Sequence, residues 1–226
     1  MYTLHIANKN YSSWSLRPWV LMRVLDIPFK EKLSPLLADS CWDSYRTFSP
    51  SGRVPCLHDG KIIVWESLAI IEYLAERHHG VWPKDSEARA WARCATAEMH
   101  AGFSTLRNEC PMSCGVRVKM HSTSSALQHD LDRIDELWNE GLNRFHGPFL
   151  AGSSFTAVDA FFAPVAFRVQ TFDLSLSDNA TAYVQRLLNL DAMRDWYAAA
   201  LNEPWREVSH DQTIMETGVI IKDLRV

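Results

Sequence analysis

Serine hydroxyls near the N-terminus are the first groups in the chain whose position suits chemistry on a bound thiol. Tyr11-Ser12-Ser13-Trp14 follows a loop and precedes a helix predicted over residues 16–25, with Pro18 in its first turn. A hydroxyl at such a site can donate a hydrogen bond to a thiolate, which contributes roughly 1.5–3 kcal/mol. Because one pKa unit corresponds to about 1.4 kcal/mol, this bond and the helix terminus could lower a thiol pKa of about 8.5 by roughly one to two units. The alternative is that these serines only cap the helix.

A second group of candidates surrounds a predicted β-hairpin. Val54-Pro55 precedes an apolar segment, and a proline there indicates a turn, an edge strand or a cis peptide bond. A cis bond would leave the Val54 backbone free to pair with an extended ligand. Asp59-Gly60 is typical of a tight turn between two strands, the second of which covers residues 62–65.

Glu66 and Ser67 begin the helix that follows this hairpin. Leu68, Ile71 and Leu74 recur at helical spacing, so they would share one buried face. A serine at such a place most often caps the helix. The combination of side chains indicates more, because a helix N-terminus attracts a carboxylate while the Glu66 carboxylate suits an ammonium group. A small peptide with a zwitterionic end fits this arrangement.

These segments resemble the bacterial cytosolic glutathione transferases, and their motifs are nearest to the serine-type zeta and theta classes. The run SLAIIEYL from Ser67 to Leu74 is similar to the zeta class, and Ser12 matches the leading serine of its Ser-Ser-Cys-Ser motif. Ser12 therefore ranks first, and Ser13 second, as the hydroxyl that activates a thiol. Trp14 stands where the motif has cysteine, which counts against a zeta-type isomerase.

The resemblance implies a homodimer that uses glutathione as its co-substrate. It gives Ser12 and Ser13 the catalytic role. For glutathione binding it implies Arg53, Val54, Pro55, Glu66 and Ser67, and for the second substrate Trp14, Met99, His100, Phe103 and Arg107. The expected reaction conjugates the glutathione thiolate to a small apolar electrophile, as in detoxification. A zeta-like isomerase of the maleylacetoacetate type and a non-enzymatic interaction module are the alternatives.

The order of predicted elements indicates an α/β part followed by an all-α part. Strands and helices follow the order β, α, β, α, β, β, α up to about residue 78, with residues 36–48 only loosely helical. In the resembled family this order belongs to a thioredoxin-like domain. We expect that domain at residues 1–79, a linker at 80–86, and an all-helical bundle that binds the substrate at 87–226.

Helical periodicity dominates the second half of the chain. Long helices are predicted over 88–106 and 126–145, and another helix or a pair of helices over 183–201, with a kinked or flexible segment at 108–125. The pattern after residue 204 does not decide whether that tail folds over the cleft or packs at the surface. Thr156 and Asp159 form a capping-box pattern before an apolar run, and we assign them to folding and not to catalysis.

The composition excludes several classes of protein. A net charge of −4 offers no basic surface for nucleic acid, and no apolar run approaches the roughly 18 residues of a membrane span. Since the N-terminus shows no secretory signal pattern, we expect a cytoplasmic protein. The five cysteines have neither disulfide nor zinc spacing, so no metal site is predicted. The absence of Cys-x-x-Cys at the first helix excludes dithiol exchange there.

Overall fold

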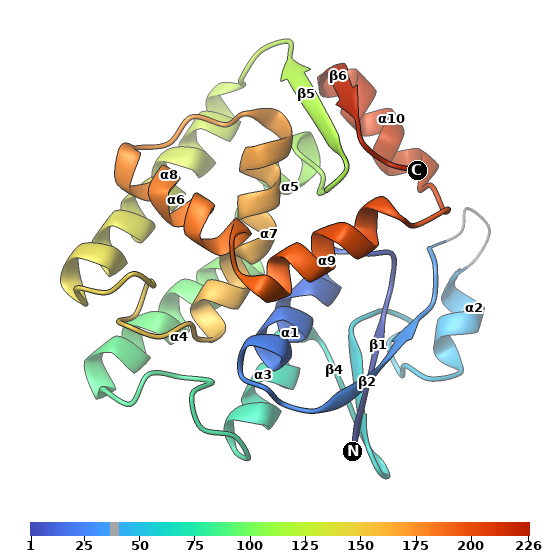
Figure 1. The fold of residues 1–226 in the computed structure, drawn as a ribbon, viewed down its shortest axis with the longest axis vertical. Helices are drawn as coiled ribbons and strands as arrows, with labels where there is room; N and C mark the ends of the chain where they lie inside the picture. The colour runs from blue at the N-terminus through green and yellow to red at the C-terminus, as the bar shows by residue number, and fades with distance from the viewer. Residues whose placement is uncertain (37–40) are drawn as a thin grey trace.

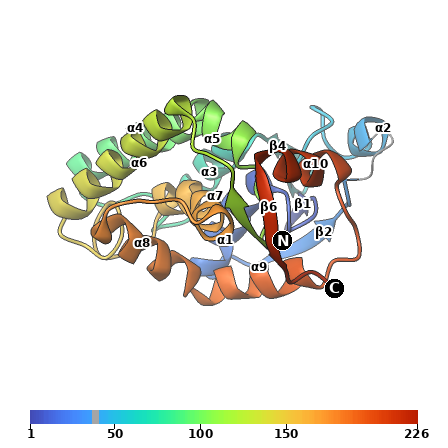
Figure 2. The same cartoon turned by 90° about the horizontal axis from the view of Figure 1, so that it is seen from above.

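The computed structural model describes residues 1–36 and 41–226, with only the backbone of Cys41. It has an N-terminal part that combines a sheet with helices and a C-terminal part that is mostly helical (Figures 1 and 2). The first part contains β1 (Tyr2–Ile6), α1 (Ser13–Val24), β2 (Phe29–Leu33), α2 (Cys41–Arg46), β3 (Cys56–Asp59), β4 (Ile62–Trp65) and α3 (Ser67–Ala75). The second contains α4 (Ser86–Ala101), α5 (Ser104–Glu109), β5 (Val116–Met120), α6 (Ser125–Arg144), α7 (Ala157–Phe172), α8 (Asp178–Leu188), α9 (Asp191–Leu201), α10 (Val208–Thr217) and β6 (Gly218–Asp223).

Four strands form the sheet of the N-terminal part, in the order β2-β1-β3-β4. β1 runs parallel to β2, with Tyr2 opposite Phe29, and antiparallel to β3, with Leu4 opposite Leu57. Gly60, at φ +59°, lies in the tight turn between β3 and β4 that the sequence predicts. The thioredoxin-like fold is thereby confirmed.

Helix α1 joins the two parts, because it packs on the central helix α7. α7 is apolar on nearly all sides and is buried along most of its length, as expected of such a helix. The predicted capping box is present at its start. The Asp159 carboxylate accepts hydrogen bonds from the Thr156 N–H at 2.9 Å, the Leu150 N–H at 3.0 Å and the Tyr183 hydroxyl at 2.8 Å. The assignment of Thr156 and Asp159 to folding agrees with these contacts.

The start of α1 differs from the prediction. The helix begins at Ser13 and not at residue 16, so Pro18 lies in the helix interior and not in the first turn. Because proline has no N–H, the Trp14 carbonyl lacks its usual helical donor. Of the helix predicted over 36–48, residues 37–40 lie outside the described residues, and α2 covers Cys41–Arg46.

The helix predicted over 88–106 is interrupted. α4 ends at Ala101 with Gly102 as its C-cap, and Phe103 adopts the left-handed conformation at φ +56° before α5 begins. Glycine weakens a helix, which explains the break. The apolar periodicity nevertheless continues across it, because α5 buries Leu106 on the same side of the core.

Helix α6 confirms the helix predicted over 126–145. It has an amphipathic sequence of 20 residues and buries, among others, Leu127, Leu131, Ile134 and Trp138. Its other face is charged. Among the helices of residues 1–36 and 41–226, none is both long and apolar enough to cross a membrane.

A two-stranded antiparallel sheet of β5 and β6 belongs to the C-terminal part and was not predicted. Val116 lies opposite Asp223 and Met120 opposite Gly218. β5 falls in the segment 108–125, where a kink was expected, and β6 in the tail that the sequence left undecided. The helical character of the C-terminal part is confirmed, and this small sheet is an addition to it.

Candidate active site

A cavity of about 370 Å³ lies where the start of α1, the segment before β3, and residues of α5 and α7 meet. Of the predicted site residues, its wall contains Ser12, Ser13, Trp14, Arg53, Val54 and Arg107. The wall also contains Tyr11, Leu36, Tyr45, Gly52, Pro111, Met112, Arg168 and His210. The predicted residues that are not on it are Pro55, Glu66, Ser67, Met99, His100 and Phe103.

The loop before α1 is held in place by the C-terminal part. The N–H groups of Lys9 and Asn10 donate to the Glu203 carboxylate at 2.7 and 3.1 Å. The Trp196 indole N–H donates to the Lys9 carbonyl at 2.8 Å, and the Cys114 N–H donates to the Asn10 carbonyl at 3.1 Å. These bonds fix the position of the serines at the start of α1 relative to both parts of the chain.

Ser12 is the N-cap of α1 and Ser13 is its first residue. The Ser12 side chain makes no capping hydrogen bond. Its hydroxyl donates instead to the Ser15 hydroxyl at 2.7 Å, and Ser15 also accepts from the Ala7 N–H at 3.2 Å. The Ser13 hydroxyl makes no hydrogen bond to any residue that the structure describes, so it is available to a ligand.

The predicted cis peptide bond joins Val54 and Pro55. Pro55 is buried, whereas Val54 is half-buried and Arg53 is exposed on the cavity rim. Within residues 1–36 and 41–226, no backbone hydrogen bond involves Val54, which precedes the first paired residue of β3. Its N–H and carbonyl are therefore available to an extended ligand.

Glu66 is the N-cap of α3 and Ser67 its first residue, so the expectation that Ser67 caps the helix is wrong. The Glu66 backbone has φ +69° and ψ +132°, a conformation that costs a non-glycine residue roughly 1–3 kcal/mol. The Ser67 hydroxyl is buried and has no hydrogen-bond partner in the described part of the chain. A buried hydroxyl without a partner is unfavourable, which marks the N-terminus of α3 as a site for a ligand.

Trp14 lies between two guanidinium groups. The Cζ atoms of Arg17 and Arg107 lie 4.0 and 4.6 Å from the Trp14 ring centroid. The His100 ring meets the same indole edge-on, with 5.4 Å between the ring centroids. Arg107 donates to the carbonyls of Met99 and His100. Met99 and His100 therefore support Trp14 and Arg107 from behind.

Met99 and Phe103 do not reach the cavity, although the sequence analysis placed them at the substrate wall. Their exposed fractions are 0% and 7%, and both belong to the hydrophobic core. The resemblance assigned them to the wall, but their helical spacing is that of a face turned toward the core. Burial is the main cause that lowers the pKa of His100, and repulsion from Arg17 is the second.

The sequence analysis missed two buried arginines in this region. Arg168 on α7 lines the cavity and donates to the carbonyls of Cys110 and Pro164 at 2.8 and 3.3 Å. Arg17 on α1 is 1% exposed, and its Nε and Nη1 atoms have no partner among the described residues. The pKa of Arg168 is lowered to about 10, mainly by burial and secondly by repulsion from Arg107. The signal for Arg168 was a basic residue in the apolar sequence of α7, whose other charged residue is the capping-box Asp159.

The C-terminal tail supplies one residue of the cavity wall, His210, and holds Tyr11 in place. The Tyr11 hydroxyl donates to the Asp211 carboxylate of α10 at 3.2 Å and accepts from the Arg225 guanidinium at 2.9 Å. Arg225 also pairs with Asp211 at 2.7 Å. His210, one residue before Asp211, lines the cavity, and its ring centroid lies 5.5 Å from that of Tyr11. The tail therefore packs against the cleft, which is one of the two possibilities that the sequence left open.

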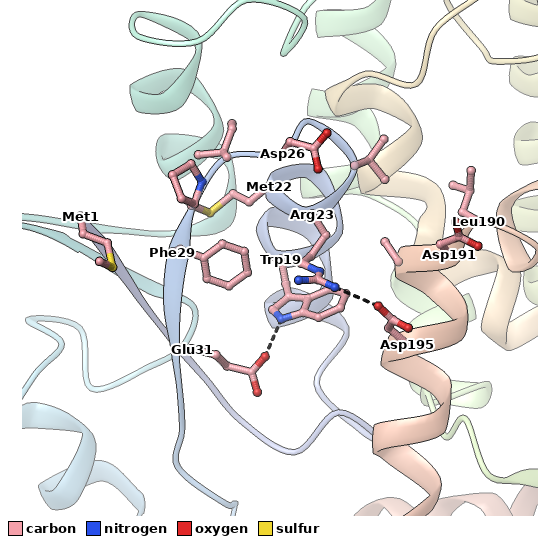
Figure 3. A pocket seen from close by; sticks show the side chains of 14 residues that line it. Met1, Trp19, Met22, Arg23, Asp26, Phe29, Glu31, Leu190, Asp191 and Asp195 are labelled. Carbon is pink, nitrogen blue, oxygen red and sulfur yellow. Dashed lines mark hydrogen bonds and ion pairs between the residues drawn. The ribbon is translucent and has the colours of Figure 1, made fainter.

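A larger cleft, of about 710 Å³, lies between α1, β2 and α9 (Figure 3). Four of its polar side chains form two pairs. The Trp19 indole donates to Glu31 at 2.6 Å, and Arg23 pairs with Asp195 at 2.9 Å. It contains none of the predicted site residues, so we place the candidate active site in the smaller cavity.

The sequence matches two family models, the glutathione S-transferase N-terminal domain over residues 11–77 and the glutathione S-transferase C-terminal domain over residues 97–191. The chain belongs to the glutathione S-transferase family. A probable maleylacetoacetate isomerase of Caenorhabditis elegans is 29% identical over 175 residues, which cover 75% of this chain and 80% of that protein.

Solved structures share the fold. A glutathione transferase homolog from Burkholderia, solved with bound glutathione, has a TM-score of 0.66 at 20% sequence identity. The match covers 88% of this chain and 97% of the Burkholderia chain. The unclassified glutathione S-transferase 2 of Bombyx mori has a TM-score of 0.71 at 18% sequence identity. This match covers 96% of this chain and 99% of the Bombyx mori chain.

Proposed function

We propose that this protein binds glutathione at the N-terminus of α3 and transfers its thiolate to a small electrophile. The observation that carries the proposal is the buried Ser67 hydroxyl without a partner, at a helix N-terminus that attracts a carboxylate. The exposed Glu66 carboxylate beside it suits an ammonium group. A carboxylate and an ammonium group are the charges of the γ-glutamyl end of glutathione, and the related Burkholderia structure holds this ligand.

The remaining parts of glutathione follow from the groups left available around the cavity. Its cysteinyl backbone would pair with the N–H and carbonyl of Val54, which have no backbone partner in the described chain. The exposed Arg53 side chain offers a contact to the second carboxylate. With the backbone held at Val54, the thiol points toward Ser12 and Ser13 on the same cavity wall.

The chemistry requires stabilisation of a thiolate and room for an acceptor. The Ser13 hydroxyl, or that of Ser12 once it gives up its bond to Ser15, donates to the sulfur at the N-terminus of α1. The thiol proton leaves to solvent. The sulfur then attacks an electrophile held beside Trp14, in the part of the cavity that α5 and α7 close.

A zeta-like isomerase is the second candidate function. It is favoured by the similarity to a probable maleylacetoacetate isomerase and by the zeta-like run from Ser67 to Leu74. Trp14, which replaces the cysteine of the zeta motif, counts against it. An isomerase would return glutathione unchanged, whereas a transferase consumes it.

We further propose a cytoplasmic homodimer whose domains span residues 1–79 and 87–226, with a linker at 80–86. Exposed apolar side chains on the edge strand β4 support the dimer, since Ile62, Ile63 and Trp65 have exposed fractions of 48%, 39% and 43%. Light scattering on Trp65→Glu and on wild type tests this. The substitution should give a monomer if β4 lies in the interface.

Calorimetric titration with glutathione tests the binding site. Ser67→Ala should weaken binding roughly ten- to a hundredfold, because a hydrogen bond to a charged group contributes roughly 1.5–3 kcal/mol. Ser86→Ala, which changes the first residue of α4, is the matched control. Loss of free thiol with a chloronitroarene supports the transferase. Turnover of a cis-unsaturated keto acid with full recovery of glutathione would support the isomerase instead, and absence of glutathione binding would contradict both.

A further inference from the structure

Three arginines from three helices lie at the substrate end of the candidate active site. Arg17 lies on α1, Arg107 on α5 and Arg168 on α7. Arg107 and Arg168 line the cavity, and Arg17 shares the Trp14 ring with Arg107. Arg17 and Arg168 are buried, with exposed fractions of 1% and 4%, and Arg107 is half-buried.

These cations have no paired anion. Among the side chains that the structure describes, no aspartate or glutamate lies within 4.0 Å of the guanidinium of Arg17, Arg107 or Arg168. Over the same residues, no carboxylate lines the cavity. Buried charges in proteins are ordinarily paired, because removal from water is costly without a compensating charge.

The bonds that the arginines do make orient them without neutralising them. Arg168 is held by the carbonyls of Cys110 and Pro164, and Arg107 by two carbonyls at the end of α4. Asp130 attracts Arg107 at longer range, but its carboxylate accepts the Leu106 N–H at 2.9 Å. A fixed pair of cations facing a cavity is the usual arrangement for binding an anion.

We propose that the electrophile carries a carboxylate, and that Arg107 and Arg168 bind it while Trp14 and Met112 contact its apolar body. This inference rests on the proposed glutathione transfer, and it replaces the purely apolar electrophile that the sequence analysis expected. The cavity volume of about 370 Å³ is at the low end for ligand sites, so the acceptor is small. Arg17 lies behind Trp14 and adds to the positive potential.

A pair of chloronitroarenes that differ only in charge tests the proposal. 4-Chloro-3-nitrobenzoate carries a carboxylate, and its methyl ester does not. In both, the thiolate sulfur forms a bond to the ring carbon that bears chlorine, and the electron pair moves into the nitro-substituted ring. The carbon–chlorine bond then breaks and chloride leaves with its electron pair. Each kcat/KM is divided by the rate constant of the uncatalysed reaction with glutathione, which removes the difference in intrinsic reactivity.

The variants are Arg168→Gln, Arg107→Gln and the charge-retaining Arg168→Lys. Arg117→Gln is the control, because Arg117 also donates to backbone carbonyls but does not line the cavity. Wild type should favour the carboxylate at least about tenfold, and each glutamine variant should reduce that preference roughly ten- to a hundredfold. Arg168→Lys should retain most of it. Affinity for glutathione should stay within about twofold throughout.

Three results would overturn the proposal. Wild type could prefer the ester, or the folded glutamine variants could keep the wild-type preference for the carboxylate. The third result is that these variants lose affinity for glutathione while they keep that preference. Failure of the transfer reaction is a separate outcome. If no conjugate forms, calorimetry with the unreactive 3-nitrobenzoate and its methyl ester still decides whether the arginines select a carboxylate. A preference there that Arg168→Gln removes would support the anion site and refute only the transfer.

Discussion

The two serines at the start of α1 should differ in their effect on the thiol of bound glutathione. Ser13 has a hydroxyl without a partner in the described structure, so Ser13→Ala removes a hydrogen bond to charged sulfur of roughly 1.5–3 kcal/mol. That loss raises the pKa of the thiol by about one to two units. Ser12 must first give up its 2.7 Å bond to Ser15, which contributes roughly 0.5–1.5 kcal/mol. Ser12→Ala should therefore raise the thiol pKa by about one unit or less.

The assay is the ultraviolet difference spectrum of bound glutathione, recorded against pH for wild type and each variant. The thiolate absorbs where the thiol does not, so its titration gives the pKa directly. Ser86→Ala controls for the loss of a hydroxyl at a helix start, because Ser86 opens α4 as Ser13 opens α1. This control should leave the thiol pKa unchanged.

Two results would refute this reasoning. If Ser12→Ala alone abolished the shift, the bond from Ser12 to Ser15 would not limit its action, and the order expected from the zeta-type motif would be correct. If glutathione still bound to both alanine variants with an unchanged thiol pKa, neither hydroxyl would stabilise the thiolate. The serine-type mechanism would then be wrong even though the binding site is real.

Three further predictions concern stability. Asp159→Asn should lower the free energy of unfolding by about 2–4 kcal/mol in urea denaturation, because the amide cannot accept the Thr156 N–H as the carboxylate does, and a gain in stability would contradict the buried capping box. Burial lowers the pKa of His5 to about 4, so the folded state binds fewer protons than the unfolded state between about pH 6.5 and 4. The protein should therefore become less stable as the pH is lowered through that window. The melting temperature should therefore decrease less between pH 7 and pH 5 in His5→Phe than in wild type. Tyr11→Phe should cost about 1 kcal/mol by urea denaturation, because the Arg225 guanidinium loses an acceptor, and an unchanged stability would show that this contact is not used in solution.

The elements that the sequence predicted correctly are those whose signals are local. The Asp59-Gly60 turn, the helix from Ser67 and the box of Thr156 and Asp159 each depend on a few consecutive residues. For the same reason the hairpin and the two helix starts could be located without knowledge of the tertiary structure.

Features that depend on distant contacts could not be predicted. β5 alternates Val116 and Val118 with charged residues, but its partner is the last strand of the chain. Arg168 lies in the mostly apolar helix α7, and only the fold shows that it faces the same cavity as Arg107. The resemblance placed Met99 on the substrate wall, whereas its helical spacing indicates only a buried face, and Met99 lies in the core.

The contact between Tyr11 and Arg225 joins residues 214 positions apart, and this affects the order in which the protein is completed during synthesis. At about 5–20 residues per second, a ribosome adds Arg225 roughly 10–40 seconds after Tyr11. The sheet and α3 are translated long before that, so the thioredoxin-like part can form while the tail is still missing. His210 of the tail lines the cavity, and Asp211 and Arg225 hold Tyr11 on its wall, so this side of the cavity is completed only after those residues have been made. A nascent chain can thus present the proposed glutathione site before it has a complete site for the acceptor.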